Sequence, residues 1–163
     1  MGMVVVHAAT EEEWEVLRDI RLAALRDAPD AFLSTLAEQA TSAEADWRRR
    51  ISRGCTYFAY IPAVNGSEPV GLVGGFEDQP GTVELVSLWV RPEARGLGVG
   101  QVLVTAVVDW AKARNAASVH LWLMATNQHA RALYERCGFS DTDERQPLPT
   151  NKGLTEVGMI LPL

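Results

Sequence analysis

One continuous stretch, residues 83–114, constrains the fold more than any other part of the sequence. It begins with an apolar run, Val83–Val90, in which only Glu84 and Ser87 are polar. A run that is apolar on both faces is typical of a central strand that is covered on two sides. Pro92 ends the strand, because proline has no N–H to donate to a sheet. We therefore expect a strand, a short break and then a helix.

The helix is indicated by apolar side chains at i, i+3, i+4 and i+7 spacing, with polar residues on the opposite face. These positions are Val99, Val102, Leu103, Ala106, Val107 and Trp110. The loop between strand and helix reads Arg95-Gly96-Leu97-Gly98-Val99-Gly100. Alternating glycines let an anion approach the backbone, and successive N–H groups can converge on it. Since the helix N-terminus and Arg95 add positive charge, the loop is predicted to bind a pyrophosphate.

This loop differs from the common dinucleotide and mononucleotide loops. Gln101 stands where the third glycine of GxGxxG is required, and the Gly-Lys-Ser/Thr of a P-loop is absent. The spacing Val90-x4-Arg95-Gly96-x-Gly98-x-Gly100 instead resembles the acyl-coenzyme A motif of the GNAT superfamily of N-acyltransferases. The simpler alternative is an ordinary glycine-rich turn between a strand and a helix.

A second segment resembles the same family. Asn127, Ala130, Tyr134, Gly138 and Phe139 fit its N-x-x-A-x-x-x-Y-x-x-x-G-F pattern, and Asn127 is also a natural helix N-cap. The resemblance implies that Asn127 hydrogen-bonds the pantetheine arm and that the Tyr134 hydroxyl protonates the leaving thiolate. A phenol of pKa about 10 can donate to a thiolate of pKa about 8.5. Tyr134 also lies on an apolar helix stripe, so a core position is the alternative.

Glu84 is the candidate general base. An attacking ammonium must lose a proton, and a carboxylate can take it directly or through a water molecule. Some members of the family place a base near this position of the strand. The alternative is a carboxylate at the solvated end of a strand, without a catalytic role.

The resemblance also implies backbone roles in the central strand. A bulge would splay Val83–Val90 from a parallel neighbour, Ser118–Met124, so that Leu88 and Val90 pair with pantetheine and the N–H of Leu88 polarises the thioester carbonyl. Ser87 fits either a bulge residue or, more simply, a packed hydroxyl. The implied acetyl-CoA site comprises Leu88, Trp89, Val90, Arg95, Gly96, Leu97, Gly98, Val99, Gly100, Asn127, Ala130 and Tyr134.

Composition excludes several functions. The net charge of −6 and pI of about 5.1 disfavour a non-specific nucleic-acid partner. The absence of a long apolar run, together with the acidic N-terminal region, argues against a membrane span or a signal peptide and favours a cytoplasmic protein.

His7, His120 and His129 lack metal-ligand spacing, so no metal is expected, and His120 is interpreted as a satisfied core or edge histidine. Two cysteines without a CxxC favour free thiols, with one disulfide as the alternative, and Cys137 is assigned to packing.

The whole chain, residues 1–163, is expected to form a single domain. Its order of elements is similar to the GNAT fold: an α/β (α+β) architecture with a mixed, strongly bent sheet of six or seven strands and about four helices on both faces. We expect strands at 3–7, 55–61, 69–76, 83–90, 118–124, from 139 onward, and at 157–161. The helices are expected at 10–27, 41–54, 99–114 and 127–138, and residues 31–40 are ambiguous.

Four local predictions accompany this order. Capping boxes are expected at Thr10-x-x-Glu13 and Thr41-x-x-Glu44, a hairpin turn at Asn65-Gly66, and a polar loop at Glu144–Gly153. Val157–Leu161 is expected at a sheet edge, where two copies could pair as a homodimer. The basic run at 48–50 is interpreted as a solvated helix face, and a phosphate contact is the alternative.

The resemblance implies an acetyl-CoA-dependent N-acetyltransferase in which a primary amine attacks directly in a ternary complex. A small-molecule amine or amino acid is the favoured acceptor, placed over residues 14–35 and 144–153. A protein or peptide amine, or a module that binds acyl-CoA without turnover, remain the alternatives.

Overall fold

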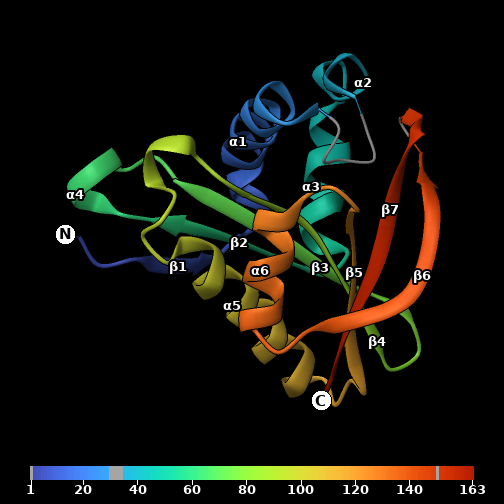
Figure 1. Ribbon diagram of the computed structural model, residues 1–163. Coiled ribbons are helices and arrows are strands. Elements are labelled where there is room, and N and C mark those ends of the chain that lie inside the picture. The colour runs from blue at the N-terminus through green and yellow to red at the C-terminus, as the bar shows by residue number, and fades with distance from the viewer. Residues whose placement is uncertain (1, 30–34, 150) are drawn as a thin grey trace.

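The computed structural model describes residues 2–29, 35–149 and 151–163. These residues form one seven-stranded sheet with strand order β1-β2-β3-β4-β5-β7-β6 and helices on both faces (Figure 1). The strands are β1 (Val5–Ala8), β2 (Cys55–Tyr60), β3 (Gly71–Gln79), β4 (Thr82–Val90), β5 (Ser118–Met124), β6 (Ser140–Leu148) and β7 (Asn151–Pro162). The helices are α1 (Trp14–Asp27), α2 (Leu36–Ala40), α3 (Glu44–Ser52), α4 (Pro62–Asn65), α5 (Val99–Ala113) and α6 (Gln128–Arg136), with short 3-10 turns η1 (Glu11–Glu13) and η3 (Pro92–Ala94).

The predicted mixed sheet is confirmed. Strands β4 and β5 pair in parallel, whereas every other neighbouring pair is antiparallel. Helix α5 follows β4 and precedes β5, as a parallel connection requires. All four predicted helical segments contain a helix, and α2 and α4 are short additions.

Two hydrophobic cores lie on the opposite faces of the sheet. One packs under α5 and α6 and includes Leu103, Val107 and Met159, each 0% exposed. The other packs under α1 and α3 and includes Trp47 and Phe58, also 0% exposed. These cores hold the central strands rigidly between two helical layers, so residues at the strand ends are well positioned to build a site.

Of the two predicted capping boxes, only the first is confirmed. The box at residues 10–13 forms at the start of η1, whereas Thr41 ends α2 instead of starting a helix. Thr35 and Glu38 cap α2 reciprocally. Helix α3 follows Ala43, whose N–H donates to the Asp46 carboxylate at 3.0 Å. A short helix before Thr41 therefore shifts the true start of α3 by two residues.

The Asn65-Gly66 hairpin turn is also wrong. Strands β2 and β3 do pair antiparallel, but Pro62–Asn65 form α4 between them and Gly66 ends it with φ of +60°. Proline at the first helical position favours a helical start because its missing N–H would have no partner there.

The polar loop predicted at Glu144–Gly153 is a long hairpin. Strand β6 continues to Leu148 and β7 begins at Asn151. Most residues of β6 are exposed and it lies at the sheet edge, so polar residues and Pro147 are tolerated there.

The sheet edges consequently differ from those predicted. Strand β7 lies between β5 and β6, so the homodimer edge predicted at Val157–Leu161 is wrong, and the outer strands are β1 and β6. No helix among the described residues is long and apolar enough to span a membrane. Part of the ambiguous segment 31–40 lies outside the described residues.

Candidate active site

The loop between β4 and α5 presents open backbone amides. Gly96 and Gly98 have φ of +80° and +83°, a conformation that side chains disfavour. A Cβ added to either glycine would meet no atom within 4 Å, so the space before them is open. No described residue accepts a hydrogen bond from the amides of Gly96, Leu97 or Gly98, and α5 begins at Val99 without a side-chain cap. These donors at a positive helix end suit an anionic ligand.

Gly100, in the same loop, allows close helix packing. A Cβ there would lie 2.9 Å from Cδ2 of Leu133, so the missing side chain lets α5 and α6 pack closely. At the start of α6, the Oδ1 of Asn127 accepts the Ala130 N–H at 3.1 Å, which confirms the predicted N-cap. The side-chain nitrogen Nδ2 of Asn127 makes no hydrogen bond to a described residue and remains a donor for a ligand.

Arg95 joins the loop to the end of α1. Its Nη2 lies 2.6 Å from Oδ2 of Asp27, and its Nε donates to the carbonyl of Val90 at 3.0 Å. The same Asp27 oxygen accepts the indole N–H of Trp89 at 2.9 Å. These bonds, led by the one from Trp89, hold the pKa of Asp27 below its ordinary value. The charge that Arg95 was predicted to add to the loop is therefore shared with Asp27.

Strand β4 carries a bulge at Ser87. Leu72 pairs with Trp89 and Gly74 pairs with Val86, so β4 has one extra residue between these pairs. Ser87 has φ of +63°, which is uncommon for a residue other than glycine. The bulge implied by the family resemblance is confirmed, and Ser87 is its central residue rather than a simply packed hydroxyl.

The bulge changes which side chains face each core. Val83 and Leu85 pack under α5 before it, and Leu88 and Val90 pack on that side after it. Trp89 packs under α1 and α3, so its side chain is enclosed by the opposite core. An extra residue in one strand reverses the alternation of its side chains in this way.

The parallel strands β4 and β5 separate just before the bulge. Their pairing runs from Thr82 with Ser118 to Glu84 with His120 and continues no further. The edge of β4 that faces β5 therefore has no strand partner from residue 85 to residue 90. The predicted backbone contacts of Leu88 and Val90 lie along this open edge, although the Val90 carbonyl already accepts from Arg95.

A chain of three titratable side chains lies at the end of the paired region. Nδ1 of His120 is 2.9 Å from Oε2 of Glu84, and its Nε2 is 2.9 Å from Oε1 of Glu144. The side chains of Glu84 and His120 are 12% and 13% exposed. Only the imidazolium form can donate from both ring nitrogens, so this arrangement favours a protonated His120 between two carboxylates.

The electrostatics of these groups agree with that assignment. The hydrogen bond that His120 donates to Glu84 is the largest cause that raises the pKa of His120, and it outweighs burial. Burial raises the pKa of Glu84, while His120 opposes that effect. Oε1 of Glu84 makes no hydrogen bond to a described residue and is available as a proton acceptor.

Gly158 of β7 makes room for this chain. A Cβ at Gly158 would lie 3.0 Å from Nε2 of His120, 2.9 Å from Oε1 of Glu144 and 2.7 Å from Oγ1 of Thr142. Thr142 also donates its hydroxyl to that Glu144 oxygen at 2.9 Å. Backbone and side chains from three strands thus fix the orientation of His120.

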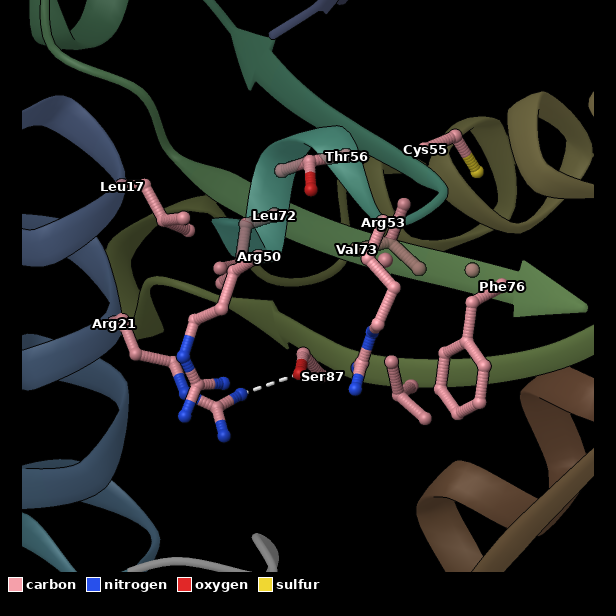
Figure 2. Close-up of a pocket in the computed structure, with 13 residues that line it drawn as sticks. Leu17, Arg21, Arg50, Arg53, Cys55, Thr56, Leu72, Val73, Phe76 and Ser87 are labelled. Atoms are coloured by element: carbon pink, nitrogen blue, oxygen red, sulfur yellow. Dashed lines mark hydrogen bonds between the residues drawn. The ribbon is translucent and has the colours of Figure 1, made fainter. Parts of the chain in front are cut away.

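The three-residue chain lines a pocket of about 740 Å³. Another part of the lining is cationic and consists of Arg21, Arg50 and Arg53. Figure 2 shows these arginines directed toward the same space, with Arg21 hydrogen-bonded to the Ser87 hydroxyl. Burial, aided by Arg50, lowers the pKa of Arg21 to about 9.

Tyr134 lies inside the core beneath α6. Its ring meets Phe139 edge to face with 5.8 Å between centroids, and the residue is 7% exposed. The phenol oxygen makes no hydrogen bond to a described residue. Because burial raises the pKa of Tyr134, the phenol stays protonated near neutral pH and can act as a donor.

Comparison with known proteins identifies the family. Residues 14–139 match the model of the acetyltransferase (GNAT) family, which is most of the chain. The chain belongs to the GNAT family. The predicted family resemblance is therefore confirmed, and the glycine loop, the bulge and the start of α6 all lie within the matched residues.

Similarity to individual GNAT proteins covers less of the sequence. An uncharacterized N-acetyltransferase of Methanocaldococcus jannaschii is 30% identical over 90 residues, which are 52% of this chain and 39% of that protein. Mycothiol acetyltransferase of Beutenbergia cavernae is 41% identical over 59 residues, or 36% of this chain and 20% of that protein. The alignments thus span well under half of either relative.

Solved structures support the GNAT fold over nearly the full length. The protein yncA from Salmonella typhimurium, solved with its cofactor acetyl-CoA, matches with a TM-score of 0.75 at 18% identity. The match covers 99% of this chain and 94% of that protein. At this identity the likeness concerns the fold alone.

The residues of this GNAT chain that sequence analysis assigned divide into two groups. The glycine loop joins the end of β4 to α5, and Asn127 caps α6, which packs closely on α5 at Gly100. Glu84 lies in a separate pocket lining with His120 and Glu144, whose involvement the sequence analysis missed. The pairing of Glu84 with His120 could have been found only from the β4–β5 register.

The cationic lining was missed as well. Arg50 belongs to the basic run interpreted as a solvated face, but it lines the pocket instead. Among the described residues, no group of three His, Cys, Asp or Glu side chains is suited to hold a metal ion.

Proposed function

We propose that this GNAT protein transfers an acetyl group from acetyl-CoA to a primary amine while both substrates are bound. The observation that carries the proposal is the open β4 edge, which lies between a loop of unpaired amides and the Glu84–His120–Glu144 chain. The loop of amides suits an anionic coenzyme, and the Glu84–His120–Glu144 chain suits an ammonium. Holding both substrates in one place makes the transfer effectively unimolecular.

The residues present fit acetyl-CoA, which would supply the activated acetyl group. The amides of Gly96, Leu97 and Gly98 and the N-terminus of α5 would bind its pyrophosphate. Asn127 would bind the pantetheine arm with its free amide nitrogen, and Leu88 and Val90 would bind it with backbone groups. The N–H of Leu88 would stabilise negative charge on the carbonyl oxygen during attack.

Glu84 is the proposed general base. Its Oε1 would take a proton from the acceptor ammonium, directly or through water, while its Oε2 stays bonded to His120. The protonated His120 keeps Glu84 ionised despite its burial, so His120 acts as a positioning residue. Tyr134 would protonate the departing thiolate, consistent with a phenol that remains protonated.

A small-molecule amine or amino acid is the proposed acceptor. The pocket of about 740 Å³ has the size of a small-ligand site. One relative is named for mycothiol, a name that supports a small acceptor without identifying the one used here.

Thiol release from acetyl-CoA across a library of amines tests the proposal. Glu84→Gln should lower kcat about 100-fold at pH 7, the usual contribution of a general base. The loss should shrink at higher pH, because a growing fraction of the amine is then already deprotonated. Glu77→Gln, on the exposed part of neighbouring β3, is the matched control and should retain full activity.

Two outcomes would contradict parts of the proposal. If Glu84→Gln lowers the rate equally at every pH, Glu84 is not the base. Calorimetric binding of acetyl-CoA without thiol release for any amine would instead indicate a non-catalytic acyl-CoA-binding module.

A further inference from the structure

The pocket beside Glu84 has a cationic part that the proposed transfer does not use. Arg21 comes from α1, Arg50 from α3, and Arg53 from the residue that follows α3. All three line the pocket beside Ser87 (Figure 2). Arg21 is held in place, since its Nε donates to Oε1 of Gln39 at 3.0 Å and its Nη1 donates to Ser87.

The arginines on α3 that point away from the pocket are ion-paired. Arg48 lies 3.6 Å from Glu44, and Arg49 lies 3.0 Å from Asp46. These pairs are typical of a solvated helix face, as the sequence analysis expected for this run.

Arg50 and Arg53 are different. Within the described part of the chain, neither has a carboxylate within 4.0 Å. Arg50 instead lies over the ring of Trp47 at 5.5 Å, and Arg53 lies over the ring of Phe76 at 4.2 Å. The aromatic faces orient both guanidinium groups but do not neutralise them.

Placing these cations together has an energetic cost. Burial and then the neighbouring Arg53 lower the pKa of Arg50, and Asp46 only partly opposes them, so the surroundings of Arg50 disfavour its charge. A bound anion would relieve this cost. A guanidinium fork also matches the two oxygens of a carboxylate or phosphate geometrically.

We propose that the acceptor amine also carries a carboxylate or phosphate group, which Arg50 and Arg53 bind while the amine lies beside Glu84. This inference rests on the proposed acetyl transfer. The Glu84–His120–Glu144 chain attracts the ammonium and the arginines attract the anion, so the pocket orients an acceptor that has both. A free amino acid and an aminoalkyl phosphate share this chemistry, whereas a peptide N-terminus has its first carboxyl group in an amide bond.

Matched acceptors provide the test in the intact protein. We would measure kcat/KM for glycine, alanine, glutamate and phenylalanine against their amides, and for phosphoethanolamine against ethanolamine. The anionic member of the accepted pair should be preferred about 10- to 100-fold, the range expected for a charge-assisted hydrogen-bonded contact. The amino-acid and phosphate pairs distinguish the two sources of the anion.

Variants of the arginines sharpen the test. The double variant Arg50→Gln/Arg53→Gln should reduce the preference for the anionic acceptor to within about threefold. Arg50→Lys/Arg53→Lys keeps the charge but loses the guanidinium fork, so its preference should lie between those of the parent and the Gln variant. Arg49→Gln, paired on the outer face of the same helix, should keep the full preference. Thermal melts establish that each variant is folded.

A binding measurement makes the result independent of turnover. In calorimetric titrations, the N-acetyl derivatives of the same amino acids should bind more tightly than N-acetyl amino acid amides, and Arg50→Gln/Arg53→Gln should remove the difference. Equal kcat/KM for acids and amides, or a preference that survives in the double variant, would overturn the anion site but leave acetyl transfer intact. Absence of thiol release with every amine would instead contradict acetyl transfer, and the titrations would still decide on the anion site.

Discussion

The two sides of the candidate site are built in different ways. The proposed coenzyme side consists mainly of backbone groups from two continuous segments, the glycine loop before α5 and the start of α6. The proposed acceptor side consists of scattered side chains from α1, α3 and strands β3 to β7. Strand β4 contributes to both sides, because Glu84 is its last residue paired with β5 and the open edge begins directly after it and includes the bulge at Ser87.

This difference teaches which parts of the protein can vary independently. The coenzyme side depends on φ angles and missing side chains, so its chemistry is the same for any acceptor. The acceptor side depends on side-chain identity at positions that are far apart in the sequence. A change of acceptor therefore requires only scattered substitutions, which leave the glycine loop untouched.

The largest expected effect tests the backbone side. Gly98→Val should raise the Kd for acetyl-CoA by about two to three orders of magnitude, because a β-branched residue is strained at φ of +83° and the anion loses its approach to the amides. Calorimetry with acetyl-CoA measures the loss. The acceptor pocket should remain able to bind acetylated product.

Gly81→Ala is the control for backbone strain alone. Gly81 has the same φ of +83° but lies in the turn between β3 and β4, where a Cβ would make an ordinary contact with Ala117 at 3.8 Å. It should lower the melting temperature without changing coenzyme affinity. Unchanged affinity in Gly98→Val would show that the loop does not hold the coenzyme.

The same contrast explains what the sequence could predict. The order of strands and long helices was predictable because it follows from local apolar spacing. The glycine loop was predictable because its residues are adjacent in the sequence. The hairpin of β6 and β7 was not predictable from the sequence. An exposed edge strand tolerates polar residues and proline, so its sequence resembles that of a loop. The start of α3 was missed because Thr35 and Thr41 compete as caps, and local pattern does not decide between them.

The acceptor side was largely unpredictable for a physical reason. Glu84 was a candidate because it is polar in an apolar strand, but its partner depends on the register that places it opposite His120. Gly158 matters through the space it leaves for Glu144 and His120, which only the packed sheet reveals. Such relations join residues of different strands, and no periodicity within one element encodes them.

An intermediate effect tests whether Tyr134 serves the coenzyme side or only the core. Tyr134→Phe keeps the ring that packs on Phe139 and removes the hydroxyl, so kcat should fall roughly 10- to 100-fold if the phenol is the acid. The KM for acetyl-CoA should change little. Steady-state thiol release measures both constants.

Tyr57→Phe is the matched control, since Tyr57 packs against the same core and burial likewise raises its pKa. It should leave kcat unchanged. If Tyr134→Phe changes only the melting temperature, the residue belongs to the core and another group protonates the thiolate.

The smallest effect tests whether the contact between α1 and the glycine loop couples the two sides. Asp27→Asn should destabilise the protein by about 0.2–1 kcal/mol, the range for a mostly exposed ion pair. The pKa of Asp27 is lowered on folding, so its contribution is present above the unfolded pKa and is lost as the pH falls through the folded pKa. The melting temperatures of parent and variant should therefore converge in acid. A difference in melting temperature that does not change with pH would mean that the indole and guanidinium donors bind the amide of the Asp27→Asn variant as strongly as the Asp27 carboxylate. The charge of Asp27 would then not contribute to holding the two sides together.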